Sequence, residues 1–496
     1  MSNPQRTHSS WSSWQGEGRV ALAVGVALLL GACHSRPDGT AQKTVVLALS
    51  GAALPTSPYE SARVKAISGA KLSHAEQRTA CVYRAGARAR DTVDPTDPVG
   101  DKIPLDHFVV VMQENRSFDQ YFQALPKAGQ PDVDVAPESY VNSDPSGEGE
   151  IVHPYLLHDP CVPDVPHNWI AVHHQLADGH MTGFLAAANP DGKRALGYYD
   201  ASTLGYYYAL ANTFALGDRY FAAVPGPTFP NRMFALSASS FGHAKNTAPP
   251  PRDEERTVFH QLEKRGLSWV VYSEGTTFEE EMYPRLHSEK GDHFRPMSEF
   301  YADAQAGRLP FFAWVESTYE GELPTDEHAP ANVQLGQAFV ARVIASTMKS
   351  SNWPRTALFL TYDEHGGFYD HVTPPHACAP GDEAPQIAGI RASTRFDQYG
   401  VRVPFMVVSP FARPHFVSHQ VHSHTSILRM VAARADLPAL TDRDANAEPP
   451  FEFFDFDLPA FLTPPNLPEA VIDPTQKQRC LSVAREAQAE KEKKKR

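Results

Sequence analysis

Five short apolar runs, widely spaced along the chain, have the pattern of buried strands. They occupy residues 108–112, 268–272, 311–315, 357–362 and 403–408. None alternates between apolar and polar positions, as expected when helices cover both faces of a parallel sheet. Residues 332–348 carry apolar side chains on one helical stripe, and residues 425–433 form a helix-like stretch after polar capping residues. The pattern therefore predicts an α/β fold.

An apolar run near the start has a different character. Residues 20–30 are apolar and uncharged, Arg6 and Arg19 precede them, and Gly31 and Ala32 lead into Cys33. This order is typical of a secretory signal. The segment 30–33 resembles the bacterial lipobox, which predicts cleavage before Cys33 and a lipid on that residue. The alternative is an ordinary signal peptide with a chance cysteine. No uncharged apolar stretch reaches the ~18 residues of a membrane span, so none is expected.

Composition narrows the classes of function. The 43 prolines among 496 residues exceed the usual ~5%, which favours long ordered loops. The formal charge of −13 argues against a general affinity for nucleic acid or for an anionic membrane surface.

Four further cysteines suit an oxidising compartment. Cys81, Cys161, Cys378 and Cys480 predict two disulfides with three possible connectivities. Pairing Cys81 with Cys161 and Cys378 with Cys480 closes the shorter loops. No CxxC spacing occurs, so zinc ligation is less expected.

Polar side chains directly follow two of the predicted strands. Glu114 and Asn115 come after the run 108–112, and Asp363 and Glu364 come after the run 357–362. Ligands of open α/β sheets bind beyond the carboxyl ends of the strands, and adjacent carboxylates need a cation to relieve their repulsion. The oxygen-rich set predicts one divalent ion, with Ca, Mg or Mn favoured over Zn. A helix cap or a salt bridge is the competing interpretation.

A proline-rich turn at residues 225–232 contains a candidate nucleophile. Thr228 lies in this turn, and Arg232 follows four residues later. A hydroxyl positioned beside a metal ion becomes a nucleophile, and arginine can bind phosphate oxygens with two donors. The competing interpretation is an ordinary proline turn.

Five motifs together resemble the bacterial phosphoesterase family, which contains the non-specific phospholipases C and related acid phosphatases. They are residues 114–119, 228–232, 363–371, 402–404 and 424–428, and the resemblance runs in order from about residue 104 to 437. It implies an alkaline-phosphatase-like α/β/α sandwich with a mostly parallel central sheet and hydrolysis through a covalent phospho-enzyme. It matches Glu114, Asn115, Asp363 and Glu364 to metal ligands, and Thr228 to a nucleophile that also binds the metal.

Histidines are the natural proton carriers for such a reaction. His167 and His328 stand where the family has motif histidines, His371 ends the second acidic motif, and His424 begins the last one. We expect these four to be catalytic, although any single histidine is more often a hydrogen-bonded structural residue. Arg232 is expected to bind the substrate.

Two features of the sequence favour different substrates. A threonine nucleophile favours phospholipase C cleavage of phospholipid headgroups, whereas only about 60 residues follow Leu437 and the C-terminal region common in those enzymes is not expected. The shorter architecture favours an acid phosphatase acting on phosphomonoesters. Gln120 stands where the family often has histidine. A non-catalytic lipoprotein that keeps the fold as a binding module is the alternative of another class, and a sulfatase-like activity is less favoured still.

These features predict four segments. They are a leader at 1–32, a tether and N-terminal extension at 33–100, a phosphoesterase domain at 101–475 and a charged tail at 476–496. We expect an exported protein, either a periplasmic or outer-membrane-attached lipoprotein or a secreted one. It would contact the membrane through a lipid on Cys33, bind a phospholipid or a small phosphate ester, and need no obligate protein partner.

Overall fold

A computed structural model of the chain describes residues 57–67, 69, 71–143, 151–188, 191–252, 255–387 and 395–495. Every described residue lies in one compact unit, Pro55–Arg496. The predicted leader and the lipidation site at Cys33 therefore lie outside the described residues. None of the helices in the described part has the length and apolar character that a bilayer-crossing segment needs.

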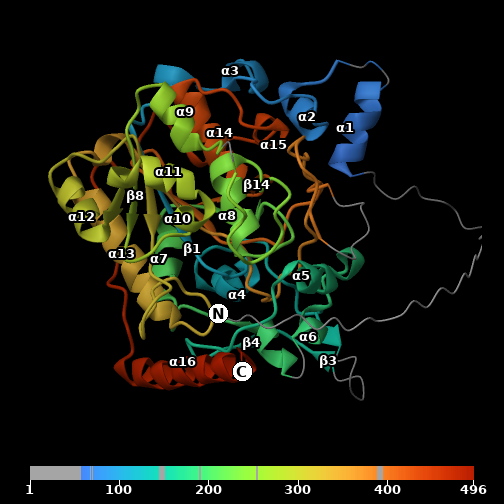
Figure 1. The fold of residues 1–496 in the computed structure, drawn as a ribbon, viewed down its shortest axis with the longest axis vertical. Coiled ribbons are helices and arrows are strands. Elements are labelled where there is room, and N and C mark those ends of the chain that lie inside the picture. Colours follow the sequence, from blue (N-terminus) through green and yellow to red (C-terminus); the bar gives the residue numbers. More distant parts are fainter. Residues whose placement is uncertain are drawn as a thin grey trace, which may run out of the picture. The chain divides into compact units, whose positions relative to one another are not determined.

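The centre of the fold is an eight-stranded sheet (Figure 1). Across the sheet, its strands are β13 (Phe416–Ser418), β6 (Ala215–Gly217), β12 (Phe405–Val408), β11 (Thr356–Tyr362), β1 (His107–Gln113), β10 (Phe312–Glu316), β8 (Trp269–Ser273) and β9 (Phe294–Pro296). Only β12 runs against its neighbours in this sheet, and the other pairings are parallel. All five predicted apolar runs form strands, so the prediction of an α/β fold with a mostly parallel sheet is confirmed.

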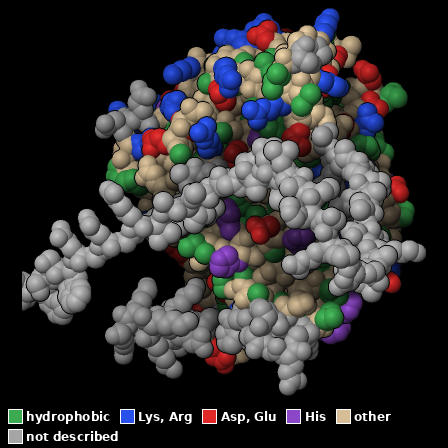
Figure 2. All heavy atoms as spheres, turned by 90° about the vertical axis from the view of Figure 1, so that its right-hand side faces the viewer, with side chains coloured by type: hydrophobic (Ala, Val, Ile, Leu, Met, Phe, Trp, Pro, Cys, Tyr) green, Lys and Arg blue, Asp and Glu red, His purple; other side chains and the backbone are tan. Residues whose placement is uncertain are grey.

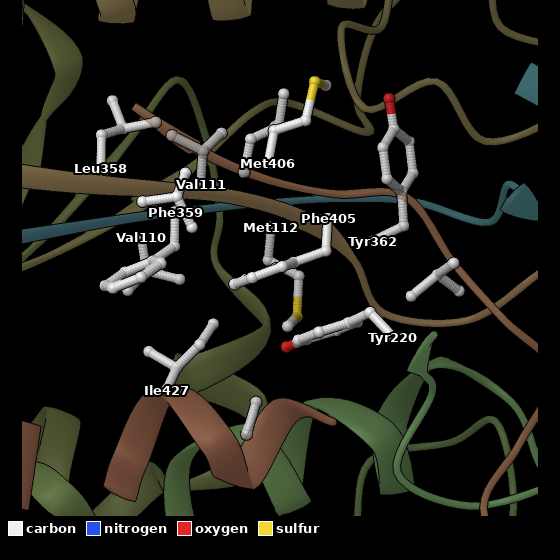
Figure 3. Close-up of a cluster of buried hydrophobic side chains, with 14 of the residues drawn as sticks. Val110, Val111, Met112, Tyr220, Leu358, Phe359, Tyr362, Phe405, Met406 and Ile427 are labelled. Carbon is white, nitrogen blue, oxygen red and sulfur yellow. The ribbon is translucent and has the colours of Figure 1, made fainter. Parts of the chain in front are cut away.

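Helices pack on both faces of this sheet. Ile427 of α14 (His424–Ala435) lies beneath Phe359 and Met112, while Leu358 and Tyr362 of β11 point to the opposite side (Figure 3). On that opposite side, the hydroxyls of Tyr362 and of Tyr207 in α7 (Gly205–Thr213) bind the same buried carboxylate, that of Glu327. The predicted helix at 332–348 is α13 (Val333–Lys349), and its apolar stripe is buried. The layers form an α/β/α sandwich because each strand is apolar on both faces.

Apart from the 22-residue α16, the remaining elements are short, and most of them lie in the connections between strands. The other helices are α1 (Pro58–Ile67), α2 (His74–Thr79), α3 (Ala89–Thr92), α4 (Phe118–Phe122), α5 (Trp169–Leu176), α6 (Phe184–Ala187), α8 (Thr228–Ser237), α9 (Val258–Lys264), α10 (Phe278–Met282), α11 (Pro284–Glu289), α12 (Met297–Gln305), α15 (Asp442–Ala445) and α16 (Pro474–Lys495). Three two-stranded sheets pair β2 (Asn142–Ser143) with β3 (Ile151–Val152), β4 (Tyr155–Leu156) with β5 (Gly197–Tyr198), and β7 (Tyr220–Phe221) with β14 (His422–Ser423).

Two disulfides are present, as expected, but not with the shorter loops. Cys81 pairs with Cys378 and Cys161 pairs with Cys480, across 297 and 319 residues. Of the three possible connectivities, the structure has one with long loops, because segments far apart in sequence lie side by side in the fold. The predicted tail is part of α16, which the bridge through Cys480 attaches to the loop before α5.

The described part of the predicted N-terminal extension contains α1, α2 and α3. Buried Arg78 pairs with Glu448, and Arg88 pairs with Asp436 just after α14. This part of the extension therefore packs against the last third of the domain.

Candidate active site

The ends of β1 and β11 bring the two predicted acidic motifs together. The strands are parallel and Gln113 lies opposite Tyr362, so the residues that follow are neighbours. The backbone N–H of Asn115 donates to Asp363 Oδ1 at 3.2 Å. Asn115 has a left-handed backbone with φ 63°, a conformation that asparagine tolerates better than most residues. Asn115, which follows β1, and Asp363, which follows β11, are therefore in direct contact.

Thr228 is the first residue of α8 and faces this strand end. Its Oγ1 donates to Asn115 Oδ1 at 3.4 Å, and its side chain is buried. The helix has no side-chain N-cap, and the N-terminus of a helix favours a bound anion through its free N–H groups. The candidate nucleophile therefore lies where a phosphate group would be stabilised.

Arg232, one turn further along α8, is surrounded by carboxylates. Its guanidinium donates to Glu316 at 2.5 Å, to Asp363 at 3.3 Å and to Glu114 at 3.4 Å. The side chain is fully buried. These contacts orient the carboxylates and occupy the donors that a phosphate would use; the expected substrate-binding role of Arg232 stays a prediction.

The carboxylate of Glu364 has one oxygen that a cation would bind. One oxygen, Oε2, accepts from the Gly366 N–H at 2.7 Å, whereas the buried Oε1 has no hydrogen-bond partner. Burial raises the pKa of Asp363 to about 7 and holds that of Glu114 well above its usual range. A buried carboxylate oxygen without a hydrogen-bond partner, next to a second carboxylate, is what a hard cation would neutralise, so these residues fit a divalent ion.

His167 and His328 lie beside this group with their rings 5.4 Å apart. Each uses Nδ1 to bind a backbone carbonyl at 2.6 Å, that of Val165 for His167 and that of Ala329 for His328. The Nε2 atom of His167 is 3.5 Å from the Asn115 amide and 3.7 Å from Glu364. In both rings Nε2 is therefore the atom available for proton transfer.

The two rings differ in basicity. Burial by itself lowers the pKa of His167, but the charges of Glu364 and Asp164 more than offset it, so that pKa lies above its usual value. Burial lowers the pKa of His328, and the attraction of Asp164 does not restore it. The neighbouring imidazoles thus favour different protonation states.

The other two predicted histidines make different contacts. His424 bonds through Nε2 to the Asp363 carbonyl at 2.7 Å and through Nδ1 to the Tyr220 hydroxyl at 3.2 Å, and burial lowers its pKa to about 4. His371 binds Asp119 at 2.7 Å and Asp134 at 3.3 Å. His424 thus contacts the backbone of Asp363, whereas His371 belongs to a separate cluster of ion pairs. The catalytic roles of both histidines stay predictions.

Three acidic residues at the site were not predicted. Glu316 ends β10 and pairs with Arg232. Inspecting the polar residue at the carboxyl end of every predicted strand would have found it. The carbonyl of Asp326 accepts from the Glu114 N–H at 2.8 Å. Glu327 follows Asp326 and is fully buried, although its loop has no pattern that marks it.

Histidine and acidic side chains also gather on the surface. Figure 2 shows several of them near the middle of one face, with lysine and arginine concentrated toward its top.

Comparisons with known proteins agree with the motif resemblance. The model of the phosphoesterase family matches residues 105–438. Phospholipase C B of Mycobacterium tuberculosis is 31% identical over 433 residues, which cover 74% of this chain and 81% of that protein. Non-specific phospholipase C1 of Arabidopsis thaliana is 32% identical over 399 residues, 74% of each chain. Among solved structures, the lipoteichoic acid synthase LtaP of Listeria monocytogenes aligns with a TM-score of 0.37 and 9% identity, covering 75% of this chain and 82% of that one.

Proposed function

Because the chain belongs to the phosphoesterase family, it is a hydrolase of phosphoric esters, and we propose that it cleaves phospholipids as a metal-dependent phospholipase C. One observation carries the proposal: the Thr228 hydroxyl heads α8 and contacts Asn115 beside the acidic pair at the end of β11. Two relatives, matched over 81% and 74% of their own lengths, are named as phospholipases C, which favours a lipid substrate.

One divalent cation would complete this site. We assign its ligands to five side chains, namely Glu114, Asn115, Thr228, Asp363 and Glu364. The unpartnered Oε1 of Glu364 supports this assignment. When bound, the ion would offset the negative charge of the phosphate and favour the ionised form of the threonine hydroxyl. An all-oxygen set favours Ca, Mg or Mn over Zn, and enzymes of the phosphoesterase family are generally metal dependent.

The reaction proceeds in two displacements at phosphorus. In the first, Thr228 Oγ1 gives up its proton and forms a bond to phosphorus, the bond from phosphorus to the diacylglycerol oxygen breaks, and that oxygen takes a proton. In the second, a water oxygen attacks phosphorus, loses a proton, and displaces Thr228 Oγ1, which takes a proton again. The products are diacylglycerol and the phosphorylated headgroup, and the intermediate is a phosphothreonine that still carries the headgroup as an ester.

His167 and His328 carry these protons in our proposal. Their Nδ1 atoms are held by backbone carbonyls, so each ring presents Nε2 in a fixed orientation. Histidine suits both directions of transfer because its pKa lies near neutral pH.

We also propose that the protein is exported and anchored through Cys33. The two disulfides support this location because such bonds persist in oxidising compartments. Metabolic labelling with a fatty acid tests the anchor, since Cys33→Ser should abolish the label.

A paired assay on the detergent-solubilised full chain tests the activity. We expect chelator-sensitive release of p-nitrophenol from p-nitrophenyl phosphorylcholine, and diacylglycerol from phosphatidylcholine vesicles. Faster turnover of p-nitrophenyl phosphate with no diacylglycerol would instead identify an acid phosphatase. Inactivity of the folded, metal-supplied protein on every ester would contradict the proposal.

A further inference from the structure

Glu327 is a fully buried carboxylate that accepts four hydrogen bonds. Its Oε1 accepts from the Tyr207 hydroxyl at 2.5 Å and from Gln113 Nε2 at 3.1 Å. Its Oε2 accepts from the Tyr362 hydroxyl at 2.8 Å and from the Tyr121 hydroxyl. A buried carboxylate that accepts four hydrogen bonds is strongly held in place, and removing it would leave three buried tyrosine hydroxyls without this acceptor, while Gln113 Nε2 would keep its bond to the Thr325 carbonyl.

Two of these donors are the last residues of the strands that lead into the site. Gln113 ends β1 and precedes Glu114, and Tyr362 ends β11 and precedes Asp363. A single side chain, that of Glu327, thus bonds to both strand ends immediately before the predicted metal ligands. The Glu327 carboxylate thus adds a side-chain link to the backbone pairing of β1 and β11 at the point where the predicted ligands begin.

The backbone of Glu327 is held as firmly as its side chain. It has φ 73°, in the left-handed region, and its carbonyl accepts two bonds from Arg116, at 2.8 Å from Nε and 2.5 Å from Nη2. Its neighbours are Asp326, whose carbonyl binds the Glu114 N–H, and His328. This backbone conformation is energetically unfavourable for a residue other than glycine, so surrounding contacts must hold it, and such residues cluster at functional sites.

Gly336 of α13 leaves room for the Glu327 side chain because glycine has no Cβ. On α13, a Cβ added at Gly336 would lie 2.1 Å from Glu327 Cγ. This close approach offers a way to displace the carboxylate without removing any polar group.

We propose that Glu327 is a positioning residue that sets the separation between the ends of β1 and β11, and with it the geometry of Glu114, Asp363 and His328. The inference rests on the proposed function only in that these three residues bind metal or move protons. Glu327 itself touches no reacting atom.

Hydrogen exchange on the full-length protein tests the positioning directly and needs neither substrate nor metal. We expect Glu327→Gln and Gly336→Ala to raise amide exchange at least tenfold in peptides covering residues 112–116 and 360–366. Two controls separate positioning from general destabilisation, and we expect neither of them to reach a tenfold rise in these peptides. Tyr208→Phe removes a hydroxyl from the same helix as Tyr207, but one that bonds to the Tyr199 carbonyl. Val343→Ala creates a core cavity in α13 and so reports general destabilisation.

Kinetics provide the second readout. Glu327→Gln and Gly336→Ala should lower kcat at least tenfold with a smaller change in KM, and Tyr207→Phe should give a weaker form of the same change. If Glu327→Gln does not fold, Gly336→Ala and Tyr207→Phe decide the question. The proposal would be overturned if amide exchange at the strand ends of Glu327→Gln and Gly336→Ala were no faster than in Val343→Ala. It would also be overturned if exchange in these variants were faster but kcat stayed at the wild-type value. If the wild-type enzyme hydrolyses no ester, the proposed function fails and exchange alone decides whether Glu327 fixes the strand ends.

Discussion

The hydroxyl of Thr228 and the side-chain oxygen of Asn115 lie 3.4 Å apart, although 113 residues separate them in sequence. One residue begins a helix, and the other makes the first turn after a strand. Their contact brings a candidate nucleophile to the carboxyl edge of the sheet, where α/β enzymes bind ligands.

Replacing Thr228 with alanine should abolish turnover. We expect kcat to fall by roughly 10³ or more, because no other hydroxyl would form the phospho-enzyme. Thr228→Ser should keep measurable activity, and trapping of labelled phosphate on the wild type, but not on Thr228→Ala, would identify the intermediate. Retention of most activity by the folded alanine variant would rule out the nucleophile assignment.

Removing a carboxylate from the predicted shell should weaken metal binding. Asp363→Asn and Glu364→Gln should each lower the metal content found by elemental analysis and reduce activity together with it, because each removes a negative charge and an oxygen ligand. Glu452→Gln is a suitable control, since Glu452 pairs with His422 on another part of the fold. An unchanged metal content in both site variants would count against this shell.

Substituting Arg232 should destabilise the protein. Arg232→Met leaves Glu114, Glu316 and Asp363 without their buried cation, and we expect the free energy of unfolding to fall by about 3–5 kcal/mol. Urea unfolding measures this loss, and Arg232→Lys should lose less. A raised KM with unchanged stability would instead favour the predicted substrate-binding role.

His371 should stabilise the fold in a pH-dependent manner. Burial lowers its pKa, but Asp119 outweighs that effect and the pKa rises from 6.5 to about 9; a bond from His371 lowers the pKa of Asp134 to about 2. A raised histidine pKa contributes stability that is complete below pH 6.5 and is lost as the pH rises through about 9.

The matching variant is His371→Gln. It should lose about 2–3 kcal/mol of unfolding free energy at pH 6 and much less at pH 10. Urea titrations of both proteins at the two pH values measure the difference. A drop in kcat at pH 6 with no loss of stability would support the catalytic role expected from the motif.

Sequence pattern predicted the strands and the acidic pairs for the same physical reason. A strand covered on both faces must be apolar throughout, so β1, β10 and β11 were visible as uninterrupted runs, and Glu114 and Asp363 were visible where those runs stop. The three-residue strands β6, β9 and β13 are too short to produce such a signal.

Tertiary contacts explain what the pattern did not reveal. The role of Glu327 depends on tyrosines from α4, α7 and β11, which no spacing along the chain brings together. The disulfide pairing stayed open for the same reason, because loop length says little about which loops meet in the folded protein.

The two disulfides have a consequence for proteolysis. The segments that they close, 81–378 and 161–480, overlap without either containing the other. A single backbone cut anywhere between Cys81 and Cys480 therefore leaves at least one bridge joining the two pieces. A nicked enzyme in a protease-rich environment would stay one covalent molecule, migrating intact on a non-reducing gel and separating into fragments only when a reductant is added.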